Sequence, residues 1–186
     1  MCMFSVVYSF VMVVPIYTMV GLQQTTVKFL FFLSIVTIMT AIGAVLGVIV
    51  GATSRDLLEA QNKLAPSLAP LILFSGWVIP KNQLAWYFKW IYDISFIQYA
   101  LTAMQVNELT GLILTYDLVI PPIPNITNTS RHVEIPITGE WVLEHALHID
   151  PNTSLPGILL LLTGMLFAII TLGYWVIRSD LSRKTG

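Results

Sequence analysis

The chain has 186 residues, of which 56% are hydrophobic and only 10% are charged, and its formal net charge is −1. Soluble domains carry about 25% charged residues, so the composition excludes an ordinary soluble enzyme and a disordered protein, and the lack of basic charge argues against a nucleic-acid binder. The single cysteine, Cys2, excludes an internal disulfide and a cysteine-based zinc site. The composition is that of a membrane protein.

Charged residues are absent from four long stretches of the sequence, which are 1–27, 29–54, 64–80 and 151–177. A helix needs about 20 apolar residues to cross a bilayer core of about 30 Å. Apolar and polar residues do not alternate in these stretches, as they would in a membrane β-barrel. We therefore predict an all-α polytopic membrane protein with four transmembrane helices, a re-entrant or interfacial helical segment and an outer loop. The predicted spans are about 1–22, 29–53, 64–80 and 155–177.

The first stretch does not look like a signal peptide, because it lacks a basic n-region and a clear cleavage site. It is apolar from its first residue, which leads us to expect that the sequence is a fragment of a longer chain. Pro15 lies inside it and is either a hinge or a proline tolerated in a membrane helix.

Glycines recur at spacing four in the second stretch, at Gly43, Gly47 and Gly51. Residues at this spacing share one helix face, and the absent side chains let another helix approach closely. We predict that this face packs against a helix. It is not a nucleotide site, because the sequence contains no G-x-x-x-x-G-K-[ST] phosphate loop.

The third stretch is shorter, contains Pro66 and Pro70, and is followed by an aromatic-rich segment at about 84–106. Two interpretations are open. Either the helix breaks between Ser75 and Pro80 and a re-entrant segment follows, or the helix simply ends and the aromatic residues form a belt at the headgroup level.

Basic residues near span ends favour the cytoplasmic side of a membrane. Such residues occur between the second and third spans and in the tail 178–186, at Arg55, Lys63, Arg178, Arg183 and Lys184. We therefore predict that both ends are cytoplasmic and that residues 107–154 form an extracellular loop. Glycosylation sequons at Asn125 and Asn128 lie in this loop, and a third at Asn152 lies too close to the last span to be reached easily.

A short amphipathic helix is expected after Gly139 in the sequence EWVLEHALHI. Glu144, His145 and His148 fall within it, but a zinc site usually needs at least three well-placed ligands. We interpret them as solvated loop residues and predict no metal site.

The segment 68–109, LAPLILFSGWVIPKNQLAWYFKWIYDISFIQYALTAMQVNEL, resembles the transmembrane domain of ABC transporters of the G subfamily, the white and pleiotropic drug resistance type. The residues that fall in register with the family's pattern are Leu73-Phe74-Ser75-Gly76, Ile79-Pro80, Trp86, Trp90, Tyr92, Ile94-Ser95, Tyr99-Ala100-Leu101 and Asn107-Glu108. The resemblance covers nearly the whole chain, weakly in the outer loop, and identifies residues 1–186 as the C-terminal part of that domain. Phe96 departs from the family's usual proline, so the turn there is expected to differ.

The resemblance implies the transmembrane portion of an ATP-driven exporter that moves hydrophobic or amphipathic substrates, such as a lipid, a sterol or a drug-like molecule. Two such domains would pair as a homo- or heterodimer in the lipid of the plasma membrane or an endomembrane. ATP and magnesium would bind a partner nucleotide-binding domain, so no catalytic residue and no enzyme activity are expected on this chain.

The resemblance also places site residues on the third span. The substrate cavity would be lined by Ala65, Ala69 and Ile72, and the exit valve would be formed by Trp77 and Val78. The other interpretation is that this span is simply a packed helix. For the whole chain, the alternative function is a truncated, non-transporting membrane subunit that pairs with full-length relatives through the glycine face. An ATP-independent channel or carrier is disfavoured by the lack of intramembrane charges and inverted repeats.

Overall fold

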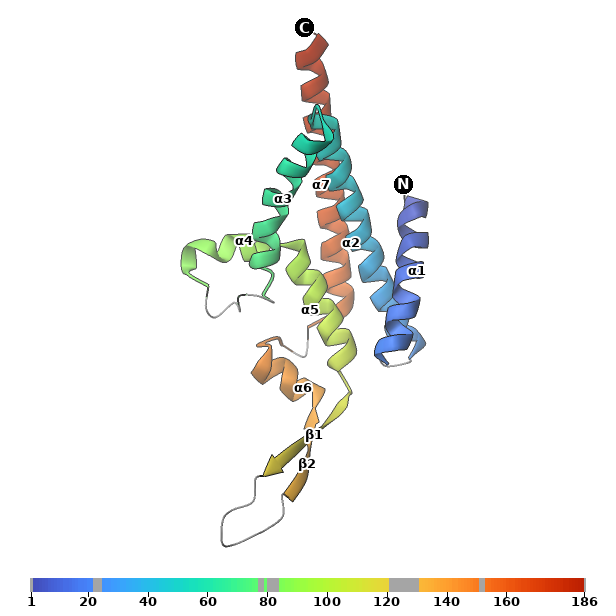
Figure 1. Ribbon diagram of the computed structural model, residues 1–186, viewed down its shortest axis with the longest axis vertical. Coiled ribbons are helices and arrows are strands. Elements are labelled where there is room, and N and C mark those ends of the chain that lie inside the picture. Colours follow the sequence, from blue (N-terminus) through green and yellow to red (C-terminus); the bar gives the residue numbers. More distant parts are fainter. Residues whose placement is uncertain are drawn as a thin grey trace.

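The computed structural model describes residues 2–21, 25–76, 79, 84–120, 131–150 and 153–185. In chain order the elements are α1 (Cys2–Val20), α2 (Thr26–Thr53), α3 (Leu57–Leu73), η2 (Trp86–Phe88), α4 (Lys89–Ile94), α5 (Phe96–Leu109), β1 (Ile113–Ile120), β2 (Arg131–Thr138), α6 (Gly139–Trp141), η3 (Val142–Ala146) and α7 (Leu155–Thr185). Figure 1 shows an elongated molecule in which α2 and α7 run along the long axis and the two strands extend from one end.

The core lies where α2, α5 and α7 meet. Ile35 and Ile42 of α2 are fully buried there, together with Leu162 of α7. Helix α5 contributes Phe96, Ala100 and Ala103, whose spacing places them on one face. The two alanines are small, so α5 can approach its neighbours closely, as is typical of helix packing in membranes.

Helix α1 packs on α2 through one narrow seam. Ser9, Val13 and Tyr17 recur every four residues and are buried, while the other apolar side chains from Phe4 to Val20 are exposed. The Ser9 and Thr40 hydroxyl oxygens lie 2.9 Å apart and join the two helices by a hydrogen bond. The exposed apolar surface of α1 matches a helix that faces lipid or other protein.

Charged side chains fix the turn between α2 and α3. The Lys63 ammonium lies 2.8 Å from a Glu59 carboxylate oxygen and donates to the Thr53 carbonyl, the last residue of α2, at 2.9 Å. The backbone N–H of Arg55 donates to the other Glu59 oxygen at 2.8 Å. Glu59 thus satisfies a backbone donor beside the start of α3, as capping carboxylates do.

The third predicted span is displaced along the chain. The prediction of 64–80 is wrong at both ends, because α3 begins at Leu57 and ends at Leu73. Its first two turns carry the charged residues that the sequence analysis assigned to a loop. Within the described part of the chain, two helices are long and apolar enough to cross a membrane, Thr26–Thr53 and Leu155–Ser179, and a shorter apolar helix covers Phe4–Val20.

The prediction of an all-α protein is wrong in the outer segment. Strands β1 and β2 pair antiparallel, with Ile113 opposite Thr138 and Ile120 opposite Arg131. β-Branched residues are frequent in both strands, which favours this pairing. Pro136 in β2 is tolerated, because each strand of a two-stranded sheet is an edge strand. The helical segment expected after Gly139 is confirmed as α6 and η3.

Candidate functional site

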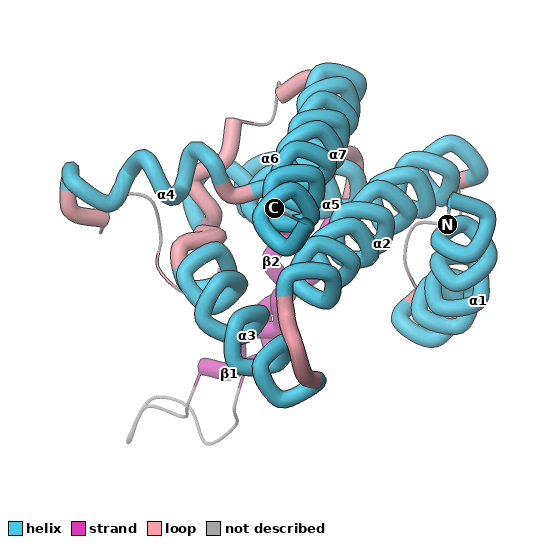
Figure 2. Tube along the Cα trace, turned by 90° about the horizontal axis from the view of Figure 1, so that it is seen from above, coloured by secondary structure: helices cyan, strands magenta, loops and turns pink. Residues whose placement is uncertain are grey.

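The three residues predicted to line a cavity share one face of α3. Ala65, Ala69 and Ile72 are spaced four and three residues apart and all are exposed, with Ile72 at 51%. Leu68 and Leu71, which flank this face of the helix, pack against the core. The three predicted residues themselves are left uncovered by the described residues of this chain. Helix α3 and helix α1 lie on different sides of α2 (Figure 2).

Two prolines lie inside α3. Pro66 and Pro70 have no N–H, so the carbonyl groups of Asn62 and Pro66 receive no hydrogen bond along the helix. Neighbouring side chains or water can pair such groups in a membrane helix. The missing bonds lower the resistance of α3 to bending in the middle of its exposed face.

Helix α3 ends at Leu73, which fits both a helix break before a re-entrant segment and a simple helix end. The Ser75 N–H bonds the Ile72 carbonyl at 3.2 Å, and Gly76 has φ +86°, a left-handed conformation that glycine adopts without strain. A Cβ atom on Gly76 would also lie 3.2 Å from the Tyr92 ring. Trp77 and Val78, the predicted exit valve, follow directly and lie outside the described residues.

A buried serine joins the end of α3 to the next helices. The Ser95 hydroxyl donates at 3.0 Å to the Leu71 carbonyl, which has lost its usual helical donor because Ser75 bonds Ile72 instead. Phe96, which replaces the family's usual proline, is the first residue of α5 and is 8% exposed in the core. The helix therefore still begins at this position, and the substitution adds a buried aromatic ring.

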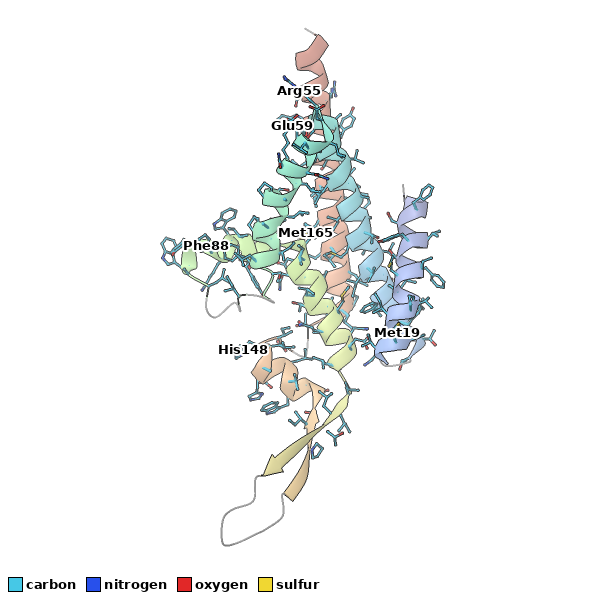
Figure 3. All side chains as sticks on the ribbon, viewed as in Figure 1. Met19, Arg55, Glu59, Phe88, His148 and Met165 are labelled. Carbon is cyan, nitrogen blue, oxygen red and sulfur yellow. The ribbon has the colours of Figure 1, made fainter. Side chains whose placement is uncertain are left out.

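The aromatic-rich segment forms a short arm beside the bundle. In Figure 1, η2 and α4 extend sideways from the junction with α5, and Figure 3 shows Phe88 on this arm. Phe88 stacks on Phe74 with ring centroids 5.0 Å apart, while Trp86 is 81% and Trp90 is 60% exposed. Exposed tryptophans on an arm that leaves the bundle are typical of the membrane interface.

A polar cluster joins α1, α2 and α5 at the other end of α5. Asn107 is 2% exposed and donates to the Lys28 carbonyl at 3.0 Å and to a Glu108 carboxylate oxygen at 2.9 Å. The Lys28 ammonium donates to the Thr110 carbonyl at 2.6 Å, and the Tyr17 hydroxyl donates to Glu108 at 3.4 Å. Sequence reasoning singled out only the Asn-Glu pair, as part of the family's pattern. Its partners come from distant segments that no local spacing reveals.

The glycine face of α2 is not covered by any described residue. A Cβ atom on Gly43, Gly47 or Gly51 would meet no described atom within 4 Å. Gly173 of α7 behaves differently, because a Cβ there would lie 2.5 Å from the Ile49 side chain. Packing of the glycine face against another helix stays a prediction, and its partner would have to come from outside the described residues.

The remaining sequence predictions concern the outer segment. Asn125 and Asn128 lie outside the described residues. His145 stacks on Trp141 with ring centroids 4.8 Å apart and 9° between the rings. Across the described ranges, no three His, Cys, Asp or Glu side chains gather in a way that could hold a metal ion.

Residues 1–109 match the family described as ABC-2 type transporter. The chain is similar to ABC transporter G family member 2 of Dictyostelium discoideum, with 36% identity over 115 residues that cover 59% of this chain and 8% of the relative. It is also similar to Protein white of Drosophila melanogaster, with 26% identity over 171 residues that cover 90% of this chain and 23% of the relative. The ABC multidrug transporter MDR1 of Trichophyton equinum is 31% identical over 127 residues, which are 67% of this chain and 8% of the relative. The chain therefore spans less than a quarter of the length of each of these relatives.

Proposed function

The chain belongs to the ABC-2 type transporter family and carries its membrane domain, and we propose that it is the transmembrane portion of an ATP-driven exporter of hydrophobic or amphipathic molecules. One observation carries the proposal. The exposed face of α3 presents Ala65, Ala69 and Ile72, which no described residue of this chain covers. Small apolar side chains in a row leave room for a hydrophobic molecule without binding it tightly.

Four spans are proposed for this chain, formed by α1, by α2, by the part of α3 that follows Lys63, and by the apolar part of α7. The α2–α3 turn and the C-terminal end of α7 then lie in the cytoplasm, and the hairpin formed by β1 and β2 lies outside. Figure 1 supports this assignment, because the α2–α3 turn and the C-terminus lie at one end of the molecule and the hairpin at the other. A nucleotide-binding domain would supply ATP hydrolysis with magnesium, and its partner surface would be at the end that carries the α2–α3 turn.

In this proposal a second transmembrane domain faces the open side of α3, so that the substrate moves between the two. Closure of the cavity requires α3 to bend or tilt, and Pro66 and Pro70 weaken the hydrogen bonding where this happens. The proposed substrate class is a lipid, a sterol or a drug-like molecule; the apolar face supports a hydrophobic substrate, and one similar protein is named as a multidrug transporter.

Transport by the full-length protein in vesicles tests the proposal. Ala69→Trp would fill the cavity, so ATP-dependent export of a fluorescent amphipathic dye should fall about fivefold to a hundredfold, because an over-filled site costs about 1–3 kcal/mol. The matched control is Ala168→Trp, since Ala168 is an exposed alanine on α7. Equal transport by the Ala69→Trp and control variants would refute the assignment of this face.

The second candidate is a non-transporting membrane subunit that pairs with relatives. The open glycine face of α2 favours it, because Gly43, Gly47 and Gly51 have no described neighbour within 4 Å of an added Cβ. The two candidates differ in whether this chain takes part in ATP-dependent transport. An exporter moves substrate when ATP is present, whereas a pairing subunit would change the abundance or the transport rate of its partner without moving a substrate itself.

A further inference from the structure

A small cavity lies between three segments that are distant in the sequence. It has a volume of about 230 Å³ and is bounded by the end of α3, by α4 and α5, and by the turn after η3. Its polar lining residues are Ser75, Tyr92, Thr102, Gln105 and His148. None of its described lining residues carries a permanent charge, so the cavity suits an uncharged polar group.

A buried amide stands behind this cavity. Gln98 is only 8% exposed, and its Nε2 donates to the Tyr92 hydroxyl oxygen at 3.1 Å and to the Thr102 hydroxyl oxygen at 3.2 Å. The Gln98 Oε1 is buried and has no hydrogen-bond partner among the residues that the structure describes. Both hydroxyl groups that the amide holds are part of the cavity lining.

Rotating the Gln98 amide by 180° does not supply the missing hydrogen bond. If the two ends of Gln98 exchange places, Oε1 accepts from the hydroxyl groups, but the NH₂ group then takes the position that lacks a partner. A buried polar atom without a partner costs about 1–3 kcal/mol. Gln98 is not itself a lining residue, so its bearing on the cavity is that it fixes Tyr92 and Thr102, which are.

The opposite wall of the cavity is held in a strained conformation. His148 has φ +54°, a left-handed value that costs a non-glycine residue about 1–2 kcal/mol. Two backbone hydrogen bonds hold the turn, from Leu147 N–H to the Val142 carbonyl at 3.1 Å and from Ile149 N–H to the Leu143 carbonyl at 2.8 Å. The turn therefore keeps His148 at the cavity despite the strain, as is common at ligand sites.

We propose that this cavity binds the uncharged, hydroxyl-bearing headgroup of an amphipathic molecule. Ser75, Thr102 and Gln105 supply donors and acceptors of the kind that hydroxyl groups pair with. The cavity is too small for a whole drug-sized molecule, so the apolar chain of the ligand remains outside. Tyr92 of α4 lines the cavity, and α4 belongs to the arm whose exposed tryptophans are typical of the membrane interface (Figure 3), which favours a lipid over a free polyol.

The inference does not require ATP-driven export, because it concerns binding alone. It is tested with a photoreactive 1-acylglycerol, which carries a diazirine near its ester, in phosphatidylcholine vesicles that contain the full-length protein without nucleotide. Peptides that contain residues 98–105 and 146–149 should be labelled. The methyl ester of the same photoreactive acid has no hydroxyl group and should label them about tenfold less. Failure of transport in separate assays would leave this result unaffected.

Variants test the hydrogen bonds and the space separately. Thr102→Val removes a lining hydroxyl and should reduce labelling about fivefold to tenfold, while Thr163→Val, the same change on α7 at a hydroxyl that bonds the Leu159 carbonyl, should not. Ala146→Trp should fill the cavity and block labelling without replacing a polar group. The elution position of each variant in detergent checks that it folds.

Competition identifies the source of the headgroup. Glycerol in excess should not displace the photoreactive lipid, which supports a lipid ligand, whereas displacement would support the hydroxyl site but assign it to a free polyol. Equal labelling by the acylglycerol and the methyl ester would overturn the proposal. Labelling that survives both Thr102→Val and Ala146→Trp would overturn it as well.

Discussion

Replacing the three glycines of α2 by alanine separates packing inside the chain from packing against a partner. Among the described residues, a Cβ on Gly43, Gly47 or Gly51 meets nothing within 4 Å, so the triple variant creates no clash with them. Alanine also favours a helix over glycine by about 0.8–1 kcal/mol per residue in water. The isolated fold should therefore be at least as stable as the parent.

The effect on association has the opposite sign. If the glycine face packs closely against another helix, three added methyl groups force the two helices apart, and overpacking costs about 1–3 kcal/mol. Each 1.4 kcal/mol weakens association about tenfold. We expect the dissociation constant in the membrane to rise at least about tenfold, measured by single-molecule photobleaching at several protein-to-lipid ratios.

Gly164→Ala is the matched control, because Gly164 lies on α7 and a Cβ there also meets no described atom within 4 Å. This variant should associate as the parent does. If the triple variant also associates as tightly as the parent, or if the control weakens association equally, the glycine face is not the contact surface.

Three further predictions follow from other contacts. Gly139→Ala should destabilise the junction of the hairpin and α6 by about 1–3 kcal/mol, because a Cβ there collides with the Leu109 carbonyl oxygen. Gly173→Ala meets only the flexible end of Ile49 and should cost less, and limited proteolysis measures both. The Lys63 hydrogen bond, followed by the Arg55 backbone N–H, lowers the pKa of Glu59 below its ordinary value of 4.5. The ionised Glu59 therefore stabilises the start of α3 fully above pH 4.5, and this stabilisation is lost as the pH falls through the lowered pKa. Hydrogen-exchange protection of the backbone amides at Leu57–Glu59 should decline over this pH range in the parent but not in Glu59→Gln. The same pH dependence in both proteins would contradict the role given to Glu59. Asn125→Gln with Asn128→Gln should lower the apparent mass in eukaryotic cells by as much as glycosidase treatment does, and an unchanged mass would argue against an extracellular loop.

Hydropathy alone predicted the helices that depend only on apolar length. Helix α2 (Thr26–Thr53) and the apolar part of α7 lie close to the predicted 29–53 and 155–177. The helix end near Ser75 was also predictable, because Gly76 needs a backbone conformation that few other residues adopt without strain.

The displacement of α3 was missed because hydropathy does not detect a helix that continues beyond the apolar stretch. Glu59 and Lys63 lie one turn apart on α3 and bond each other and the end of α2, so these charges start a helix instead of a loop. The hairpin was missed because its two strands are far apart in the sequence. Its strands are separated by a segment rich in proline and asparagine, and the pairing of Ile113 with Thr138 joins positions 25 residues apart.

The cavity behind Gln98 could not be predicted from the sequence at all. In the sequence, Gln98 is one polar residue in an apolar helix. Its partners Tyr92 and Thr102 are close to it in the sequence and do not indicate a cavity. The opposite wall, at His148, comes from a turn whose position depends on how the hairpin returns the chain to α5. The resemblance predicted that Ala65, Ala69 and Ile72 line a substrate cavity, and the structure leaves them exposed on α3, so that role stays a prediction.

The central claim, that the exposed face of α3 lines an ATP-driven pathway, is tested most directly by cysteine accessibility. Cys2 is the only cysteine of these 186 residues, so Cys2→Ser, together with replacement of every cysteine in the rest of the full-length protein, gives the background for Ala69→Cys and for Ala168→Cys as the lipid-facing comparison. In the full-length protein, Ala69→Cys should react with a water-soluble thiol reagent from the cytoplasmic side, and ATP with vanadate or an amphipathic substrate should slow that reaction at least about tenfold. Reactivity that equals that of Ala168→Cys and does not respond to nucleotide or substrate would contradict the claim.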